Sequence, residues 1–406
     1  MFDFNARHII EALRSGVPSR EVGEYFSEAR PAMRAKIAAK LDAAREEDKS
    51  GGMIFTGRYG EGKTHMLHTA FNMASERNMV VSMVSLGKET PLDKPWELYR
   101  RLIANTWLPG ARQPGFREKI EEMTAGSSLA SELFAYTATE TETNKLCFLL
   151  QALTKTEDEE ERAAFMADLE GDFAPAPLIK RSYRRIQRTP ARFSENFSKT
   201  KHWQDYYFFM SHFFRQLGYD GWVILLDEAE LIGRMGKKTR VKSYLQMQNF
   251  LRPDPRMEKT VTLLAFSASY EEDVIQKRKE FQCVEDVFGE GTEEARAATA
   301  VLNAILDAPE LGKLSQDEVT RIMRDIAQFH ALAYDWQPEV PAEDIYRATE
   351  AGGFLLRTKI RGAIELLDQL YQYGEAGNIR VGQLAMESLE EEELPDLPDT
   401  AEGPEE

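Results

Sequence analysis

Residues 57–64 read GRYGEGKT, and this stretch decides how the rest of the chain is interpreted. Its spacing, G-x-x-x-x-G-K-[ST], is that of a P-loop, whose backbone N–H groups surround phosphate oxygens. A short apolar run, MIFTG (53–57), precedes the loop, and a helical pattern, THMLHTAFNMASERN (64–78), follows it. The motif requires such a strand and such a helix. We therefore predict a nucleotide-binding loop with ATP as its ligand.

The loop and the first turn of its helix contain the residues expected to hold the phosphates. Glycines let the backbone turn and direct N–H groups at phosphate oxygens, and the helix N-terminus adds the positive end of its dipole. Lys63 is expected to reach the β- and γ-phosphates and to assist catalysis, and the Thr64 hydroxyl is expected to ligate Mg²⁺. The predicted phosphate-binding residues are Gly57, Gly60, Glu61, Gly62, Lys63, Thr64 and His65.

A second element, WVILLDEAE (222–230), supplies the acidic half of the predicted site. Its apolar residues predict a buried parallel strand, so its carboxylates emerge at the sheet edge where open α/β sheets bind ligands. Asp227 is the expected second magnesium ligand. Glu228 is the expected general base, because a carboxylate there can polarise a water in line with the γ-phosphate. The adjacent Asp-Glu pair favours an ATP hydrolase over a kinase.

Two more candidates would act near the γ-phosphate. The strand pattern VTLLAFSAS (261–269) ends in Ser267 and Ser269, either of which could hydrogen-bond the attacking water; serines that merely end a strand are an equally good interpretation. A later helix pattern carries Arg357 and Arg361 four residues apart on one face. Arg357 is the stronger candidate to reach the γ-phosphate from a helical lid, and a surface arginine is the alternative.

An arginine could also come from a second copy of the chain, which leaves a homo-oligomer open. The candidates for that role, which no spacing argument separates, are Arg234, Arg240, Arg252, Arg256 and Arg278.

Length and composition indicate a globular protein of more than one domain. The chain has 406 residues, of which 42% are hydrophobic and 29% charged. It contains no apolar run of about 18 residues and no signal-peptide layout at its start, so no membrane association is expected. Its two cysteines, Cys147 and Cys283, have no metal or redox spacing. We expect a cytoplasmic protein.

The predicted fold class is α/β, with an αβα P-loop core, a helical insertion and a helical lid. The expected domains are a helical segment over 1–50 that packs on the ATPase core, the core itself over 51–312, a lid over 313–385 and a disordered acidic tail over 386–406. A helical insertion of about 95–218 accounts for the long interval between the P-loop and the acidic strand.

The net charge of −17 first argues against nucleic-acid binding, but the acidic tail contributes much of it. Within the insertion, KRSYRRIQRTPAR (180–192) forms a basic stripe at helical spacing, a candidate surface for DNA phosphates. The alternative is a charged face paired with the acidic run EDEEER (157–162) or with a neighbouring subunit. Without a helix-turn-helix or zinc pattern, base-specific reading is not expected. The candidate contacts are Lys180, Arg181, Arg184, Arg185 and Arg188.

These motifs resemble the ATP-binding proteins of bacteriophage exclusion (BREX) defence systems, a branch of the AAA+-type P-loop ATPases. The resemblance rests on ARHIIEALRSGVPSREV (6–22), GGMIFTGRYGEGKTHML (51–67), VVSMVSLGKETPL (80–92) and LGYDGWVILLDEAELIGR (217–234). It implies a RecA-like core with strand order 5-1-4-3-2. It also implies that Arg7 and His8, with Ile9 and Val17-Pro18, help to enclose adenine.

The resemblance further implies an Mg²⁺-dependent ATPase of antiphage defence. Such a protein would act on DNA without sequence specificity, or would load or regulate a large helicase encoded alongside. Two alternatives stay open: an ATP-binding switch or adaptor that assembles a helicase complex with little turnover, and an origin- or transposition-type ATPase that recruits machinery to DNA.

Overall fold

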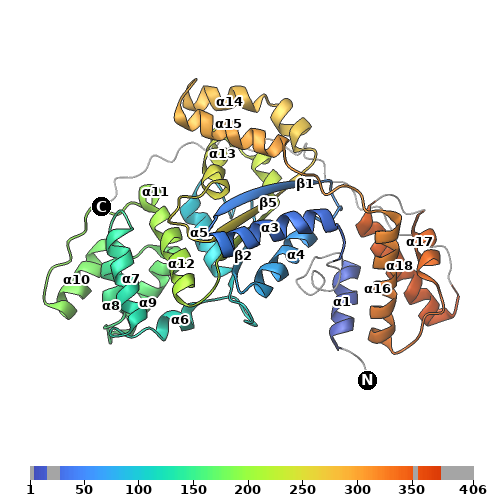
Figure 1. Cartoon of the computed structure of the whole chain (residues 1–406), viewed down its shortest axis with the longest axis horizontal. Helices are drawn as coiled ribbons and strands as arrows, with labels where there is room; N and C mark the ends of the chain where they lie inside the picture. The colour runs from blue at the N-terminus through green and yellow to red at the C-terminus, as the bar shows by residue number, and fades with distance from the viewer. Residues whose placement is uncertain (1–3, 16–27, 351–354, 376–406) are drawn as a thin grey trace.

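The computed structural model describes residues 4–15, 28–350 and 355–375, and a five-stranded sheet lies at its centre (Figure 1). The strand order is β1-β5-β4-β2-β3. Neighbouring strands are parallel except β3, which runs antiparallel to β2. The strands are β1 (Gly51–Gly57), β2 (Val80–Ser85), β3 (Thr106–Trp107), β4 (Trp222–Asp227) and β5 (Thr260–Ser267).

The predicted strand order 5-1-4-3-2 is wrong. Among the described residues, no strand pairs with the outer edge of β1. A single parallel bridge, between Thr56 and Glu310, forms there instead. The Leu311 N–H donates to the Thr56 carbonyl at 2.8 Å. The segment around this bridge contains Pro309, which has no N–H to donate, and Gly312, and both residue types are disfavoured within strands. At the opposite edge, the two-residue β3 extends the sheet instead.

Apolar layers cover both faces of the sheet. Alternate residues of β4 point to opposite faces: Val223 and Leu225 join the layer under α3 and α4, whereas Ile224 and Leu226 join the larger layer shared with the insertion. All six residues of β4 are buried. A parallel strand buried on both faces carries a continuous apolar run, which explains why this strand was readable from sequence.

The helices form four groups around the sheet (Figure 1). The helices against the sheet are α3 (Pro31–Glu47), α4 (Lys63–Glu76), α5 (Pro95–Ala104) and α13 (Lys237–Leu251). The insertion adds α6 (Arg117–Glu121), α7 (Ser128–Thr139), α8 (Lys145–Leu153), α9 (Glu159–Ala167), η1 (Asp168–Asp172), α10 (Ala176–Gln187), α11 (Lys199–His202) and α12 (Gln204–Gln216). After β4 and β5 come η2 (Ala229–Arg234), η3 (Glu271–Gln276), α14 (Glu280–Phe288) and α15 (Glu293–Leu306). The lid contains α16 (Gln316–Tyr334), α17 (Ala342–Glu350) and α18 (Leu356–Tyr373).

The first helix, α1 (Phe4–Ser15), packs on the lid, which differs from the expectation that residues 1–50 pack together on the ATPase core. Its apolar face of Ile9, Ile10 and Leu13 joins the separate apolar cluster of α16–α18. Arg14 adds two hydrogen bonds of 2.9 Å to the Asp368 carboxylate of α18. By contrast, α3 packs on the sheet. An amphipathic pattern shows that a helix has a buried face but does not say which surface covers it.

The insertion forms one continuous core layer with the sheet. Its α12 is rich in aromatic residues, and Tyr207 packs against Trp222 of β4 with ring centroids 5.9 Å apart. The Tyr207 hydroxyl donates to the Pro95 carbonyl at 2.9 Å. The insertion is therefore anchored to the strand that carries the acidic motif. Within the described ranges, no helix combines the length and apolarity needed to cross a membrane.

Candidate nucleotide-binding site

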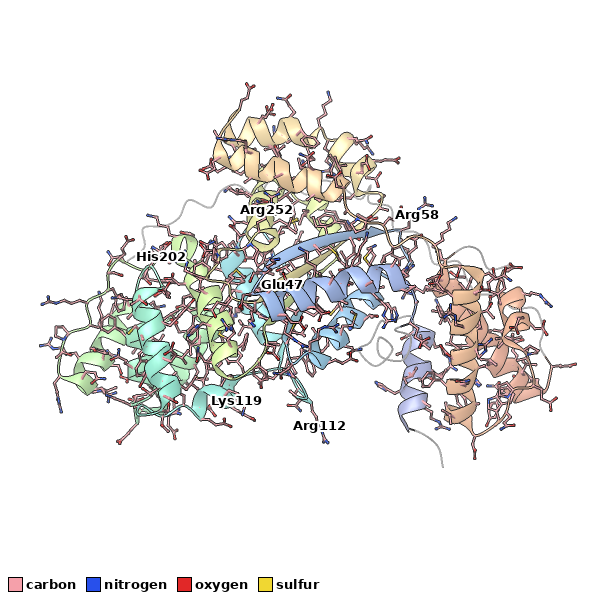
Figure 2. The ribbon with its side chains drawn as sticks, viewed as in Figure 1. Glu47, Arg58, Arg112, Lys119, His202 and Arg252 are labelled. Atoms are coloured by element: carbon pink, nitrogen blue, oxygen red, sulfur yellow. The ribbon has the colours of Figure 1, made fainter. Side chains whose placement is uncertain are left out.

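The P-loop connects the end of β1 to the start of α4, as its sequence predicts. Gly60 and Gly62 have φ angles of 75° and 89°, a conformation that glycine adopts without steric penalty. The Glu61 carboxylate accepts a hydrogen bond of 2.7 Å from the Arg58 N–H and so closes the turn. Because α4 begins at Lys63, its first N–H groups face the loop and are available to phosphate oxygens. Figure 2 labels Arg58 on the side of the core that faces the lid.

The acidic motif lies at the same edge of the sheet. Asp227 ends β4 and is only 3% exposed, and one of its carboxylate oxygens accepts the Glu228 N–H at 2.9 Å. Glu228 adopts a left-handed conformation, with φ of 53°, as the chain turns from β4 into η2. Although Glu228 is an exposed residue, partial enclosure of its carboxyl raises its pKa, and the carboxylates of Asp227 and Glu230 raise the pKa further. A raised pKa makes a carboxylate a stronger base once it is ionised.

The strand between the two motifs brings Ser267 to this edge. β5 pairs with β1 on one side, where Ser267 lies opposite Gly57, and with β4 on the other. The Ser267 and Ser269 hydroxyls are 3.0 Å apart and hydrogen-bonded. The two serines that the sequence left as alternatives therefore lie side by side. Contact of either hydroxyl with an attacking water stays a prediction.

The ammonium of Lys63 connects the loop to the acidic segment. It donates to the Gly57 carbonyl at 3.3 Å and lies 3.4 Å from Oε1 of Glu230. Sequence analysis did not identify Glu230. The available signal was the D-E-A-E spacing of residues 227–230, which places a third acid just after the strand. Burial raises the pKa of Glu230, while the nearby Lys63 lowers it.

Arg30 is a second residue at the loop that sequence analysis missed. It is 8% exposed, and its guanidinium donates to the Leu311 and Gly312 carbonyls at 3.2 and 3.1 Å. A Cβ atom at Gly62 would lie 3.4 Å from Arg30 Nη1. Arg30 therefore joins the start of α3 to the P-loop and to the segment that leads into the lid. No sequence motif predicts that an arginine so far before the P-loop in the sequence lies beside that loop in the fold.

The lid meets the loop through the first turn of α18. An Nη atom of Arg357 lies 3.5 Å from the Tyr59 hydroxyl, and a Cβ atom at Gly60 would lie 3.4 Å from the Leu355 side chain. Arg357 Nε is buried and makes no hydrogen bond within the described chain. The structure thus places Arg357 beside the P-loop. Its contact with a γ-phosphate stays a prediction.

Three of the residues expected at adenine, Arg7, His8 and Ile9, lie on α1. Arg7 donates from Nε to the Ala333 carbonyl at 2.9 Å and lies over the Tyr334 ring, at 5.4 Å from its centroid. His8 is exposed on the same helix, and Ile9 is buried in the lid cluster. Val17 and Pro18 fall outside the described residues. The predicted enclosure of adenine therefore stays untested, and Arg7 has a structural contact with α16.

The residues that could hold Mg²⁺ are the Thr64 hydroxyl, at the start of α4, and the Asp227 carboxylate. Hydroxyl and carboxylate oxygens are hard ligands that suit this ion. Among the described residues, no group of three or more His, Cys, Asp or Glu side chains could hold a metal ion. Magnesium typically takes only one or two carboxylates and completes its shell with phosphates and water. The donor set therefore fits a metal that arrives with nucleotide.

Four residues of the predicted basic stripe lie on α10, at the far end of the insertion from the lid (Figure 1), and the fifth, Arg188, caps this helix in a left-handed conformation, with φ of 61°. Arg185 forms an ion pair of 2.6 Å with Glu161, as the alternative interpretation of a charged face suggested. Lys180 lies over the Phe193 ring, at 4.7 Å from its centroid. The remaining three, Arg181, Arg184 and Arg188, are exposed and form no ion pair with a described residue.

One candidate for a trans-acting arginine is buried inside the protein. Arg240 is 3% exposed, and two of its nitrogens donate to Oε1 of Glu280 at 3.0 and 2.7 Å. It joins α13 to α14 and cannot reach a neighbouring copy. Arg256 donates to both carboxylate oxygens of Asp254 at 3.0 Å.

Comparison with known proteins identifies a family. The family model described as BREX system ATP-binding protein BrxC/D matches residues 3–125 and 118–378. No curated protein matches the chain. A solved structure, the Walker-type ATPase PABY2304 of Pyrococcus abyssi, aligns over 84% of this chain and 68% of its own, with 11% identity and a TM-score of 0.34.

Proposed function

Because the chain belongs to the BREX system ATP-binding protein BrxC/D family, we propose that it is an Mg²⁺-dependent ATPase of antiphage defence that acts on DNA. One observation carries the hydrolytic part of this proposal. The P-loop lysine and the acidic end of β4 meet at one sheet edge, where Lys63 lies 3.4 Å from Glu230, three residues after Asp227.

The residues of the chain have separate roles in this reaction. The P-loop amides and Lys63 bind the phosphates and offset their charge, and Ser267 and Arg357 approach from β5 and the lid. Bound Mg²⁺ would supply additional stabilisation of charge on the phosphate oxygens, held by Thr64 and Asp227. Glu228 directly follows Asp227 in the chain and takes a proton from the attacking water.

The basic test is phosphate release by the purified chain. Wild type should release phosphate from ATP only when Mg²⁺ is present, and Lys63→Ala should lose this activity by about 100-fold or more, because charge stabilisation at the transferred phosphate is removed. Phosphate release that survives Lys63→Ala would place the activity outside this site.

The DNA part of the proposal is supported by α10. Arg181 and Arg184 lie on this helix and Arg188 caps its end, and the three have no acidic partner among the described residues, so their charge is available to phosphates. A helicase partner belongs to the proposal through the family resemblance. Stimulation of ATP hydrolysis by DNA in the isolated chain would support direct action. Stimulation that needs the co-encoded helicase would support action through that partner.

A further inference from the structure

Glu230 forms an ion pair with Lys63, and both side chains are largely enclosed. The two side chains are 13% and 11% exposed, and the Nζ–Oε1 distance is 3.4 Å. Their partial burial strengthens the attraction relative to a solvated surface pair. Oε2 of Glu230 is buried and accepts no hydrogen bond from the described residues. Among the described residues, Lys63 is the only one that forms an ion pair with this carboxylate, and ATP phosphates require the same ammonium.

The surroundings make this competition direct. The carboxylate of Asp227 raises the pKa of Glu230, so Glu230 lies in the field of a second negative charge. When a nucleotide enters, its β-phosphate must take the ammonium, and Glu230 loses its partner. The exchange leaves a buried carboxylate facing an anionic ligand, which opposes binding.

We propose, resting on the nucleotide-binding function above, that Glu230 is a positioning residue that competes with nucleotide phosphates for Lys63 and thereby lowers the affinity for nucleotide. Glu228 remains the residue that takes the proton from water. The second acid of D-E-A-E thus has a distinct role: it competes with phosphate for the lysine. Mg²⁺ brings positive charge into the same space, so it should relieve part of the opposition.

The test is ADP binding measured by titration calorimetry in EDTA. Glu230→Gln keeps the shape of the side chain and removes its charge, so ADP should bind about three- to tenfold more tightly than to wild type. With Mg²⁺ present, the gain should shrink. A change that merely damages the site would weaken binding, so the direction of the effect separates the two explanations.

Glu228→Gln is the matched control, since it removes the same charge from the same motif without an ion pair to Lys63. Its effect on ADP affinity should be smaller than that of Glu230→Gln. Unchanged or weaker ADP binding by a folded Glu230→Gln protein, or equal tightening by both variants, overturns the inference. If Glu230→Gln fails to fold, Glu230→Asp, whose shorter side chain draws back from Lys63, must bind ADP more tightly. A wild type that binds no ADP would overturn the proposed function itself.

Discussion

Arg357 of α18 lies 3.5 Å from the hydroxyl of Tyr59 in the P-loop, so the lid touches the phosphate-binding loop through an arginine. We predict that Arg357→Ala lowers kcat/KM for ATP on the order of 10- to 100-fold, because the variant removes a positive charge that we expect to lie near the γ-phosphate. Steady-state phosphate release measures this change.

Arg361 provides the control for that variant. It lies one turn further along α18 and makes no hydrogen bond or ion pair with a described residue. Arg361→Ala should therefore hydrolyse ATP at nearly the wild-type rate. Equal losses in the two variants would show that α18 tolerates neither truncation and that Arg357 has no special position.

The start of the lid should be sensitive to acid through Glu318. Its carboxylate accepts the Arg30 N–H at 3.0 Å and the Ser315 N–H at 2.8 Å. Burial alone would raise its pKa, but these hydrogen bonds lower the pKa below its ordinary value. A carboxylate whose pKa is lowered by folding stabilises the folded state when the pH is above its unfolded pKa of about 4.3. This contribution is lost as the pH falls through the pKa of the folded state.

We therefore predict that wild type is more stable than Glu318→Gln at pH 7 and that the difference shrinks below about pH 4. Urea unfolding at several pH values measures the free energy of unfolding of both proteins. Other carboxylates titrate equally in the two, so their difference isolates Glu318. A difference that is the same at every pH would contradict the role of these hydrogen bonds.

Charge reversal on α10 should weaken DNA binding. Arg184→Glu should lower the affinity for a random duplex by about threefold or more and flatten the dependence on salt, since one phosphate contact is lost. Arg112→Glu is a matched control, because Arg112 is exposed on a loop that lies away from α10 (Figure 2). Fluorescence anisotropy over a salt series measures both. If both variants weaken DNA binding equally, the loss reflects the net charge of the protein and not a contact made by the basic stripe.

Much of the site could be predicted because its motifs are local. Gly57, Lys63 and Thr64 follow one another along a strand, a turn and a helix, and Asp227 ends a continuous apolar run, so short-range patterns were sufficient. The order of the outer strands could not be obtained in this way. A single bridge at Thr56 replaces the strand that the family resemblance implied, and its residues have no strand pattern.

The missed residues act across long stretches of sequence. Arg30 reaches Gly62 and Leu311, and Glu230 reaches Lys63, through the packing of α3, α4 and η2. An arginine or a glutamate in isolation is typical of a solvated surface, so its burial is visible only once the fold is known. The same reasoning applies to α1, whose apolar face packs on the lid.

Glu228 is the residue that we propose turns nucleotide binding into hydrolysis. Glu228→Gln should bind ATP with an affinity close to that of wild type and should lose turnover by about 100-fold or more, because the water no longer has its base. Measurement of ATP binding and phosphate release on the same preparations tests this directly. If wild type binds ATP but releases phosphate no faster than Glu228→Gln, the protein is a nucleotide-binding switch and the claim is contradicted.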